Sequence, residues 1–378
     1  MRARLTDFLW CVLLALPVLF FFQNCSSKSV DPPLVPCTTI LCTTSKFSLL
    51  AADLDGANVS VVRTSTYQEM THPRVSADKT WVAYTAYNDL DSHDCASLAK
   101  GYFNTEIRAV KIAGTDDKRV ISPTPGEFNS NSYWVGTTNE MTYLSGPVTS
   151  LKFFRATVNA SMTVISGPTQ IPVAGTIVPM DPATHAGTNK IVYPGLYNPG
   201  GGFVKSIFIM NLSNGANLVG LSIGRDHAGA NIVCANAECA NIMENDPKIS
   251  PDGTKVAFMR QAPSSGVNSF GWHIFVVPVA SPLSEVDISY AALGSNTLKN
   301  DVLPEWIDDT TLIFSTIEII SATNIVKNVY TMKSDGTQRT KIPLPEGFRY
   351  ADVFPYTDGA GKKRLIIAAD KIEAVCKQ

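Results

Sequence analysis

Short runs of apolar residues recur along most of the chain and are separated by turns rich in Gly, Pro, Asp and Ser. The clearest unit is Asp246–Phe258, in which a strand-like segment leads into the turn Ser250–Gly253 and then into the apolar run Val256–Phe258. The proline of this turn presets φ, the aspartate can bond its own backbone, and the glycine accepts a positive φ. The unit therefore predicts a strand, a tight turn and a second, buried strand.

Weaker copies of this unit predict that the pattern is an internal repeat. They are His72–Tyr84, Trp134–Tyr143, Pro179–Tyr193, Pro304–Phe314 and Asp352–Ile367.

A further alternating strand that ends at a polar or glycine turn follows five of these units, with another short strand after it. These third strands are Ile107–Gly114, Phe153–Asn159, Ile207–Gly215, Ile274–Val279 and Val329–Gly336. Four strands in each repeat are the pattern of a β-propeller blade.

The two ends of the chain decide the number of blades. Asp352–Asp370 supplies only the first two strands of a last blade, whereas Phe47–Asp53 and Val59–Arg63 match the second half of one. We therefore expect an all-β fold, a six-bladed β-propeller of four-stranded blades, closed by N- and C-terminal strands that share one blade. In this shared blade we expect burial of Phe47, Leu49 and Val61 against Leu365 and Ile367.

These motifs resemble TolB-type (WD40-like) propeller repeats, whose pattern runs Pro-x-x-Ser-Pro-Asp-Gly, an apolar strand, an Ile-Tyr-like strand and a glycine turn. The resemblance covers roughly Lys46 to Ile372 and implies a TolB-like six-bladed propeller over residues 46–378. TolB itself also carries an N-terminal α/β domain, for which the stretch from Cys25 to Ser45 has no room.

The N-terminal residues predict a targeting segment. Arg2 and Arg4 precede the apolar run Phe8–Phe22, which is short for a membrane span. We expect residues 1–24 to be a signal peptide, with an uncleaved N-terminal anchor as the alternative.

Cys25 follows this run within Phe22-Gln23-Asn24-Cys25, which resembles a lipoprotein signal-peptidase box. The resemblance implies lipidation of Cys25, a lipid-anchored linker over residues 25–45 and attachment to a membrane through the N-terminal lipid. The expected location is the periplasm or the outer membrane, as an exported, membrane-anchored lipoprotein.

Six cysteines remain in the mature chain, and an even number in an exported protein favours disulfides. Cys234 and Cys239 lie in one insertion, so we expect them to pair with each other. The spacing of the cysteines does not match that of zinc ligands. The pairing of the other four stays open, and these are Cys37, Cys42, Cys95 and Cys376.

Charge and local motifs give little support for nucleic-acid binding or catalysis. The net charge of −2 gives no basic footprint for nucleic acid. Gly220–Gly224 matches the G-x-S-x-G nucleophile motif, but it falls on the last strand of a predicted blade, whereas the motif needs a strand followed by a helix. We expect no catalytic residues, no metal ligands and no cofactor.

Three polar residues have a notable position in the repeat. His72 and Asp246 directly precede the proline of an innermost strand, and we assign Asp352 to the same position. These side chains are candidates for a binding site at the mouth of the central channel, and the alternative is that they cap the strand entry or pair locally.

The sequence therefore favours a non-catalytic cell-envelope lipoprotein that binds an unknown protein, peptide or glycan through one propeller face. The alternative is a propeller hydrolase or a metal-dependent lyase with its site at the channel mouth.

Overall fold

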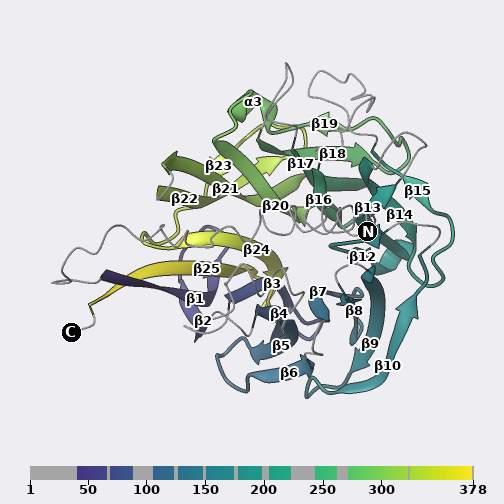
Figure 1. The fold of residues 1–378 in the computed structure, drawn as a ribbon, viewed down its shortest axis with the longest axis horizontal. Helices are drawn as coiled ribbons and strands as arrows, with labels where there is room; N and C mark the ends of the chain where they lie inside the picture. Colours follow the sequence, from purple (N-terminus) through teal and green to yellow (C-terminus); the bar gives the residue numbers. More distant parts are fainter. Residues whose placement is uncertain are drawn as a thin grey trace, which may run out of the picture.

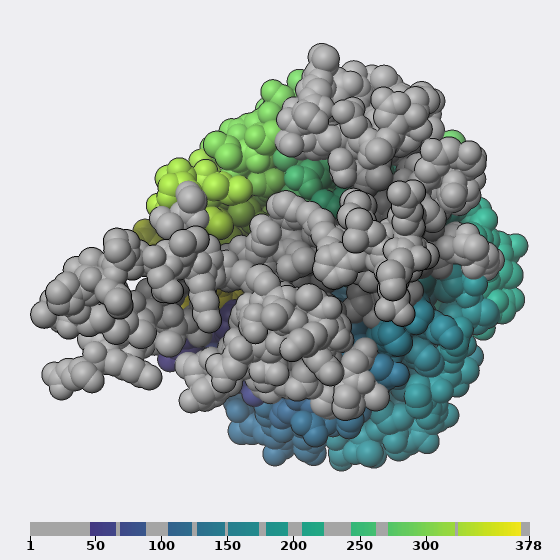
Figure 2. Space-filling view, in the orientation of Figure 1, coloured from purple at the N-terminus to yellow at the C-terminus, as the bar shows by residue number. Residues whose placement is uncertain are grey.

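A computed structural model describes residues 41–65, 69–87, 105–122, 127–147, 150–173, 178–197, 204–222, 243–261, 271–321 and 324–376. These residues form six antiparallel sheets arranged in a ring, as the strand pattern predicts (Figure 1). The sequence colours of the described surface follow the ring from blue through teal to green (Figure 2). The fold is a six-bladed β-propeller.

Blades 1 to 5 are each built from strands in chain order, from the channel outwards. Blade 1 contains β3(Glu69–Val75), β4(Trp81–Tyr87), β5(Thr105–Lys111) and β6(Lys118–Ile121), and blade 2 contains β7(Phe128–Trp134), β8(Glu140–Gly146), β9(Lys152–Val158) and β10(Val164–Ile171). Blade 3 contains β11(Val178–Pro179), β12(Ala183–His185), the 3-10 turn η2(Ala186–Thr188), β13(Lys190–Tyr197), β14(Val204–Asn211) and β15(Val219–Gly220).

The next two blades repeat this order, with one short helix between them. Blade 4 contains β16(Met243–Ile249), β17(Lys255–Gln261), β18(Trp272–Pro278) and β19(Val286–Asp287). The helix α3(Tyr290–Leu293) precedes blade 5, which contains β20(Lys299–Asp308), β21(Thr311–Ser321), β22(Asn324–Lys333) and β23(Thr340–Lys341).

Blade 6 joins the two ends of the described chain. It contains β24(Arg349–Thr357), β25(Lys363–Cys376), β1(Leu41–Asp53) and β2(Ser60–Ser65), in the sheet order β2-β1-β25-β24. Strands β1 and β25 pair from Leu41 opposite Cys376 to Asp53 opposite Arg364. The shared blade is therefore confirmed, and β1 begins at Leu41, within the stretch that we assigned to the linker.

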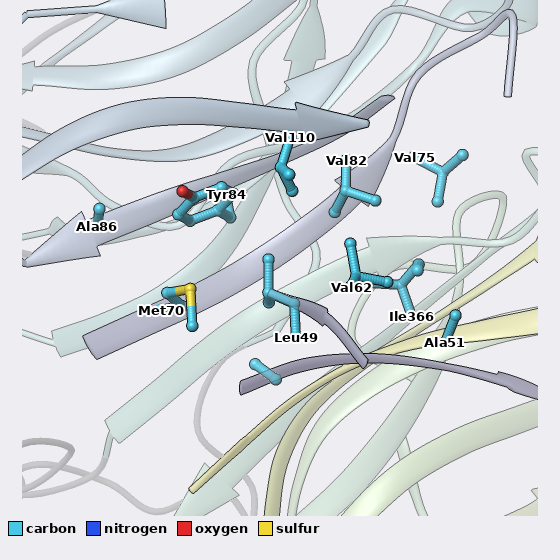
Figure 3. Close-up of a cluster of buried hydrophobic side chains, with 11 residues drawn as sticks. Leu49, Ala51, Val62, Met70, Val75, Val82, Tyr84, Ala86, Val110 and Ile366 are labelled. Carbon is cyan, nitrogen blue, oxygen red and sulfur yellow. The ribbon is translucent and has the colours of Figure 1, made fainter. Parts of the chain in front are cut away.

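The core lies between neighbouring blades. Leu49 and Ala51 point from β1 towards blade 1 and pack with Val82 and Tyr84 (Figure 3). The alternate residue Leu50 faces blade 5 with Leu365 and Ile367. Because strand side chains alternate between the two faces of a sheet, both faces of blade 6 are buried.

Part of our expectation for this blade is wrong. Val61 is 60% exposed, and the buried residue of β2 is its neighbour Val62. The pairing of β1 with β2 shifts register between Leu49 and Leu50, and this bulge leaves Val62 as the extra residue of β2. Leu49 is buried as expected, but it packs towards blade 1 rather than against Leu365 and Ile367.

The alternation of strand direction gives the ring two different faces. The turns between the first and second strands and between the third and fourth strands lie on one face, which we call the turn face. The other connections lie on the opposite face, together with the start of β1 and the end of β25, and we call this the terminal face. Every turn on the turn face is described by the structure.

The packing of blade 6 predicts which of its apolar residues stabilise the ring. Replacing Leu50 with Ala removes a side chain that is only 1% exposed, so we expect a loss of about 2–5 kcal/mol of unfolding free energy. Val61→Ala, in the neighbouring strand, should change it by less than about 0.5 kcal/mol because Val61 faces solvent. Urea unfolding measures both, and equal losses would contradict the observed register.

Candidate functional site at the channel

The innermost strands share a distortion where they converge on the channel axis. In each of five blades the pairing of the first strand with the second skips two residues, which marks a β-bulge. At this point of the strand, five blades have a residue with a positive φ that is not glycine. In four of them it is the first residue of the skipped pair, and in blade 3 it is the counterpart of that residue. These residues are His72, Asn131, Asp181, Asp246 and Leu303.

Most of the residues in these bulges suit the backbone conformation that the bulge requires. Asn, Asp and His adopt the left-handed region more readily than other non-glycine residues. Proline follows in four of the blades, at Pro73, Pro182, Pro247 and Pro304, and a bulge tolerates proline because the ladder hydrogen bond is already missing. The bulges therefore direct polar side chains and prolines towards the axis.

Three of the channel residues were expected to lie together, and the structure brings them together. The backbone N–H of His72 donates to Asp352 Oδ2 at 2.9 Å. His72 Nε2 lies 4.0 Å from Asp246 Oδ1. Asp246 and Asp352 are almost fully buried.

One detail of the repeat alignment is wrong. The bulge of β24 skips Ala351 and Asp352, so Ala351 is the counterpart of His72, and Asp352 occupies the position that Pro73 holds in blade 1. Asp352 reaches His72 from the neighbouring blade because the innermost strands of blades 6 and 1 are adjacent.

Two cations and a third carboxylate complete the cluster. Arg74 Nη2 donates to Glu305 Oε1 at 2.6 Å, across the channel from blade 1 to blade 5. Lys248 Nζ lies 3.7 Å from Glu305 Oε1 and 3.9 Å from Asp246 Oδ1. Buried charges are tolerated when they are paired in this way. The cluster therefore links blades 1, 4, 5 and 6 through the axis.

Burial shifts the protonation of these groups. It raises the pKa of Asp246 to about 6, with the neighbouring Asp181 adding to the effect, and it also raises the pKa of Glu305. Burial lowers the pKa of His72, against the attraction of Asp352 and Asp246. Burial alone would raise the pKa of Asp352, but the attraction of His72 and its backbone hydrogen bond outweigh this, so the pKa lies below its ordinary value.

The space at this cluster limits what it can do. A cavity of about 10 Å³ lies among His72, Ser132, Asp246 and Lys248, and this is roughly the volume that one water molecule needs. A sugar ring or a peptide does not fit there in this conformation. Among the described residues, no group of His, Cys, Asp and Glu has the arrangement of metal ligands.

A much larger cavity opens on the turn face. It has a volume of about 290 Å³ and lies over blades 6, 1, 2 and 3. Its lining carries cationic and aromatic groups but no carboxylate. Its lining includes Arg74, Lys79, Tyr133, His185, Phe354 and Tyr356.

Arg74 forms the boundary between the two cavities, since it lines both. Its guanidinium lies between two rings, 5.1 Å from the centroid of Tyr133 and 5.0 Å from that of Phe354. Arg74 Nη1 also donates to the carbonyl of Pro73 at 2.9 Å. A guanidinium between two aromatic rings is a rigid, favourable arrangement. The floor of the larger cavity is therefore preformed.

The rim of the larger cavity comes from the turns. Lys79 lies in the exposed turn between β3 and β4, with a φ of 63°, and makes no ion pair with any described residue. His185 Nε2 contacts the carbonyl oxygen of Pro251 at 2.7 Å, which fixes its ring. Tyr356 is half-buried near the end of β24. The only uncommitted charge of this lining is that of Lys79.

Comparisons with known proteins agree with this architecture. No protein-family model matches the sequence, and no curated protein matches it significantly. A putative TolB from Agrobacterium tumefaciens is similar in structure, with a TM-score of 0.54 and 12% identity over 88% of this chain and 100% of that one. The chain has the TolB-type propeller fold. TolB from Acinetobacter baumannii gives a TM-score of 0.50 and 10% identity over 85% of this chain, which spans only 63% of that protein.

The TolB-like repeat also shows which site residues sequence reasoning missed. Arg74, Lys248 and Glu305 each directly follow the proline of an innermost strand. Aligning the repeats by this proline would have placed the three in one layer of the channel. Lys79 and His185 had no comparable signal, because the turns differ in sequence from blade to blade.

Several other predictions concern residues outside the described part of the chain. They involve Cys25, Cys37, Cys95, Cys234 and Cys239, whose lipidation or pairing stays a prediction. The strand register places Cys42 opposite Val375 and Cys376 opposite Leu41.

The G-x-S-x-G motif begins at the end of β15, the last strand of blade 3. Ser222 is buried, and its hydroxyl donates to the Glu244 carboxylate. It also accepts a hydrogen bond from the N–H of Ile207 at 3.0 Å. This serine therefore has a structural role in joining blades 3 and 4.

The raised pKa of Asp246 predicts a pH-dependent contribution to stability. A carboxyl whose pKa is higher in the folded protein favours folding below its unfolded pKa of about 4, and loses this contribution as the pH rises through about 6. Asp246→Asn should therefore gain about 1–3 kcal/mol relative to the wild type between pH 4 and pH 7. Denaturant unfolding of both proteins at the two pH values measures this, and parallel pH profiles would contradict it.

Proposed function

We propose that this protein is a non-catalytic lipoprotein of the cell envelope that binds a protein, peptide or glycan through the turn face of its propeller. The cavity of about 290 Å³ on this face is the observation that carries the proposal. Its size approaches the usual range for ligand sites, and its lining combines aromatic surface with a few polar groups, as ligand sites do.

The charge of the lining favours a ligand with an anionic group. Lys79 is exposed at the rim, and no carboxylate lines the cavity to compete for it. The rings of Tyr133, Phe354 and Tyr356 offer flat apolar surface beside this charge. A carboxylate-bearing segment of a protein or an acidic glycan would satisfy both features.

The alternative of a hydrolase or metal-dependent lyase has weaker support. His72, Asp246 and Asp352 do lie together, but the cavity beside them has room for about one water molecule. A lyase of this kind would require stoichiometric metal. Elemental analysis of the purified protein tests it directly.

The cavity predicts which substitutions abolish binding. Lys79→Glu reverses the rim charge, and Tyr356→Ala removes an aromatic wall, so each should reduce the capture of native ligand from membranes by about tenfold or more, equivalent to ~1.4 kcal/mol. Lys341→Glu is the matched control, because Lys341 is also exposed but lies on the outermost strand of blade 5. Equal capture by all variants would exclude this cavity, and no capture by the wild type would count against a binding role.

The proposed anchor has its own test. Cys25→Ala should abolish metabolic labelling with a fatty acid and leave the protein either soluble or as an unprocessed precursor, because Cys25 directly follows the apolar run. Gel analysis of labelled cells and of membrane fractions measures this. Cys42→Ala is the control and should keep the label.

A further inference from the structure

Blade 5 carries a hairpin that extends beyond the rest of its sheet. Strand β20 ends its contact with β21 at Leu298 and Lys299, where the N–H of Ile319 donates to the Leu298 carbonyl at 2.9 Å. Strand β23 pairs only with Tyr330 and Thr331 of β22. In the described chain, residues 324–328 therefore pair only with β21, and residues 320–321 lie beyond the last contact of β21 with β20.

This extension is apolar. Ile320 is 57% exposed and Val326 is 37% exposed, and Ile319 and Ile325, which pair with each other, are partly exposed. We call these four residues the blade 5 tip. Glu318 pairs with Lys299 at 3.0 Å, which leaves no uncompensated acidic charge on the described hairpin. Exposed apolar strands of this kind are an aggregation hazard unless something covers them.

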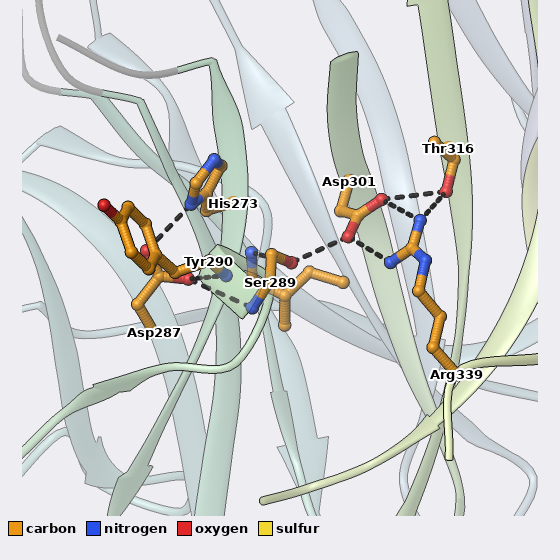
Figure 4. Close-up of polar contacts among 8 residues, drawn as sticks. His273, Asp287, Ser289, Tyr290, Asp301, Thr316 and Arg339 are labelled. Atoms are coloured by element: carbon orange, nitrogen blue, oxygen red, sulfur yellow. Dashed lines mark hydrogen bonds and ion pairs between the residues drawn. The ribbon is translucent and has the colours of Figure 1, made fainter. Parts of the chain in front are cut away.

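The base of the hairpin is held firmly. Asp301 receives two hydrogen bonds from Arg339, at 2.5 and 2.8 Å, and one from Thr316 at 2.8 Å (Figure 4). Ser289, which precedes α3, donates to the same carboxylate at 2.8 Å. Thr316 lies three residues before Ile319 in β21, so this buried network fixes the direction in which the blade 5 tip projects.

The chain termini leave the ring on the same face and from the neighbouring blade. The tip lies where the second strand of blade 5 turns into the third strand. In blade 6 the end of β25 and the start of β1 occupy the equivalent place. Both extensions lie on the left of the ring in Figure 1. Strands β1 and β25 continue as a pair for six residues beyond Phe47, which is about 20 Å.

The N-terminal segment is the observation that selects an occupant for this surface. It contains the proposed lipid site Cys25, and only residues 26–40 separate Cys25 from β1, a reach of at most about 50 Å. A membrane attached at Cys25 therefore lies within this reach of the start of β1, which is on the terminal face at blade 6. Apolar side chains that enter the bilayer add buried apolar area to the attachment that a lipid provides.

We infer that the blade 5 tip is a membrane contact, and that Ile319, Ile320, Ile325 and Val326 enter the lipid surface beside the N-terminal anchor. This rests on the anchoring part of the proposed function. It places the terminal face towards the membrane at blades 5 and 6, and it leaves the turn-face cavity accessible from the other side.

The test introduces a tryptophan at the tip. The full chain, purified from membranes and reconstituted into phosphatidylethanolamine and phosphatidylglycerol vesicles, carries either Ile320→Trp or the matched control Ile165→Trp. Ile165 is 64% exposed on the outermost strand of blade 2, across the ring. Wild-type emission is subtracted, and lipids brominated on their acyl chains act as quenchers. Val326→Trp replaces Ile320→Trp if the latter does not melt like the wild type.

We expect the emission added at position 320 to shift to shorter wavelength and to lose most of its intensity with brominated lipid, while that added at position 165 does not change. Protein that floats with the vesicles without quenching at 320 or 326 would overturn the membrane contact and leave the anchor intact. Protein that does not float would overturn both. Loss of a dimer in Ile320→Asp, without quenching in the tryptophan variants, would assign the tip to a second copy of the chain instead.

Discussion

The convergence of six strands on one axis is the constraint on which the rest of this structure depends. Side chains from all blades compete for the same narrow space, so the innermost strands of five blades bulge and most of them turn polar residues or prolines inwards. Charges confined there have to compensate one another, which Arg74, Lys248, Asp246 and Glu305 do. Among the described residues, the cavity of about 290 Å³ lies where the strands diverge again, at the mouth on the turn face. The tightness of the axis thus explains both why the cavity beside the buried cluster has room for about one water molecule and why the larger cavity lies above it.

Much of this architecture could be read from the repeat. Ser-Pro-Asp-Gly turns, alternating strands and the split last blade predict six blades, because local turn chemistry and strand periodicity depend on few residues. The burial of Val61 was predicted wrongly because a bulge reverses the alternation, and nothing in the local sequence of β1 or β2 signals that bulge. The layer formed by Arg74, Lys248 and Glu305 has a signal in the repeat, whereas the cavity rim around Lys79 arises from how neighbouring turns meet. Such contacts between blades depend on tertiary packing, which no single repeat encodes.

The two faces of the ring differ in a way that suits a tethered receptor. All connections on the turn face are short and described, and they surround the cavity. The terminal face carries the ends of β1 and β25 and the apolar hairpin of blade 5. Under the proposed function, attachment and recognition would therefore lie at opposite ends of the same strands.

The shared blade also sets an order of events during synthesis. Strand β1 is the first described strand to be made and β25 the last, yet the two form the longest pairing among the described strands. Until β25 has been made, the edge of β1 opposite β2 lacks its partner, and the apolar residues of blades 1 and 5 that face blade 6 stay partly uncovered. Pairing of segments so far apart in the chain is slow, because a long loop has to close before the two strands can form contacts. Closure of the described ring therefore waits for β25.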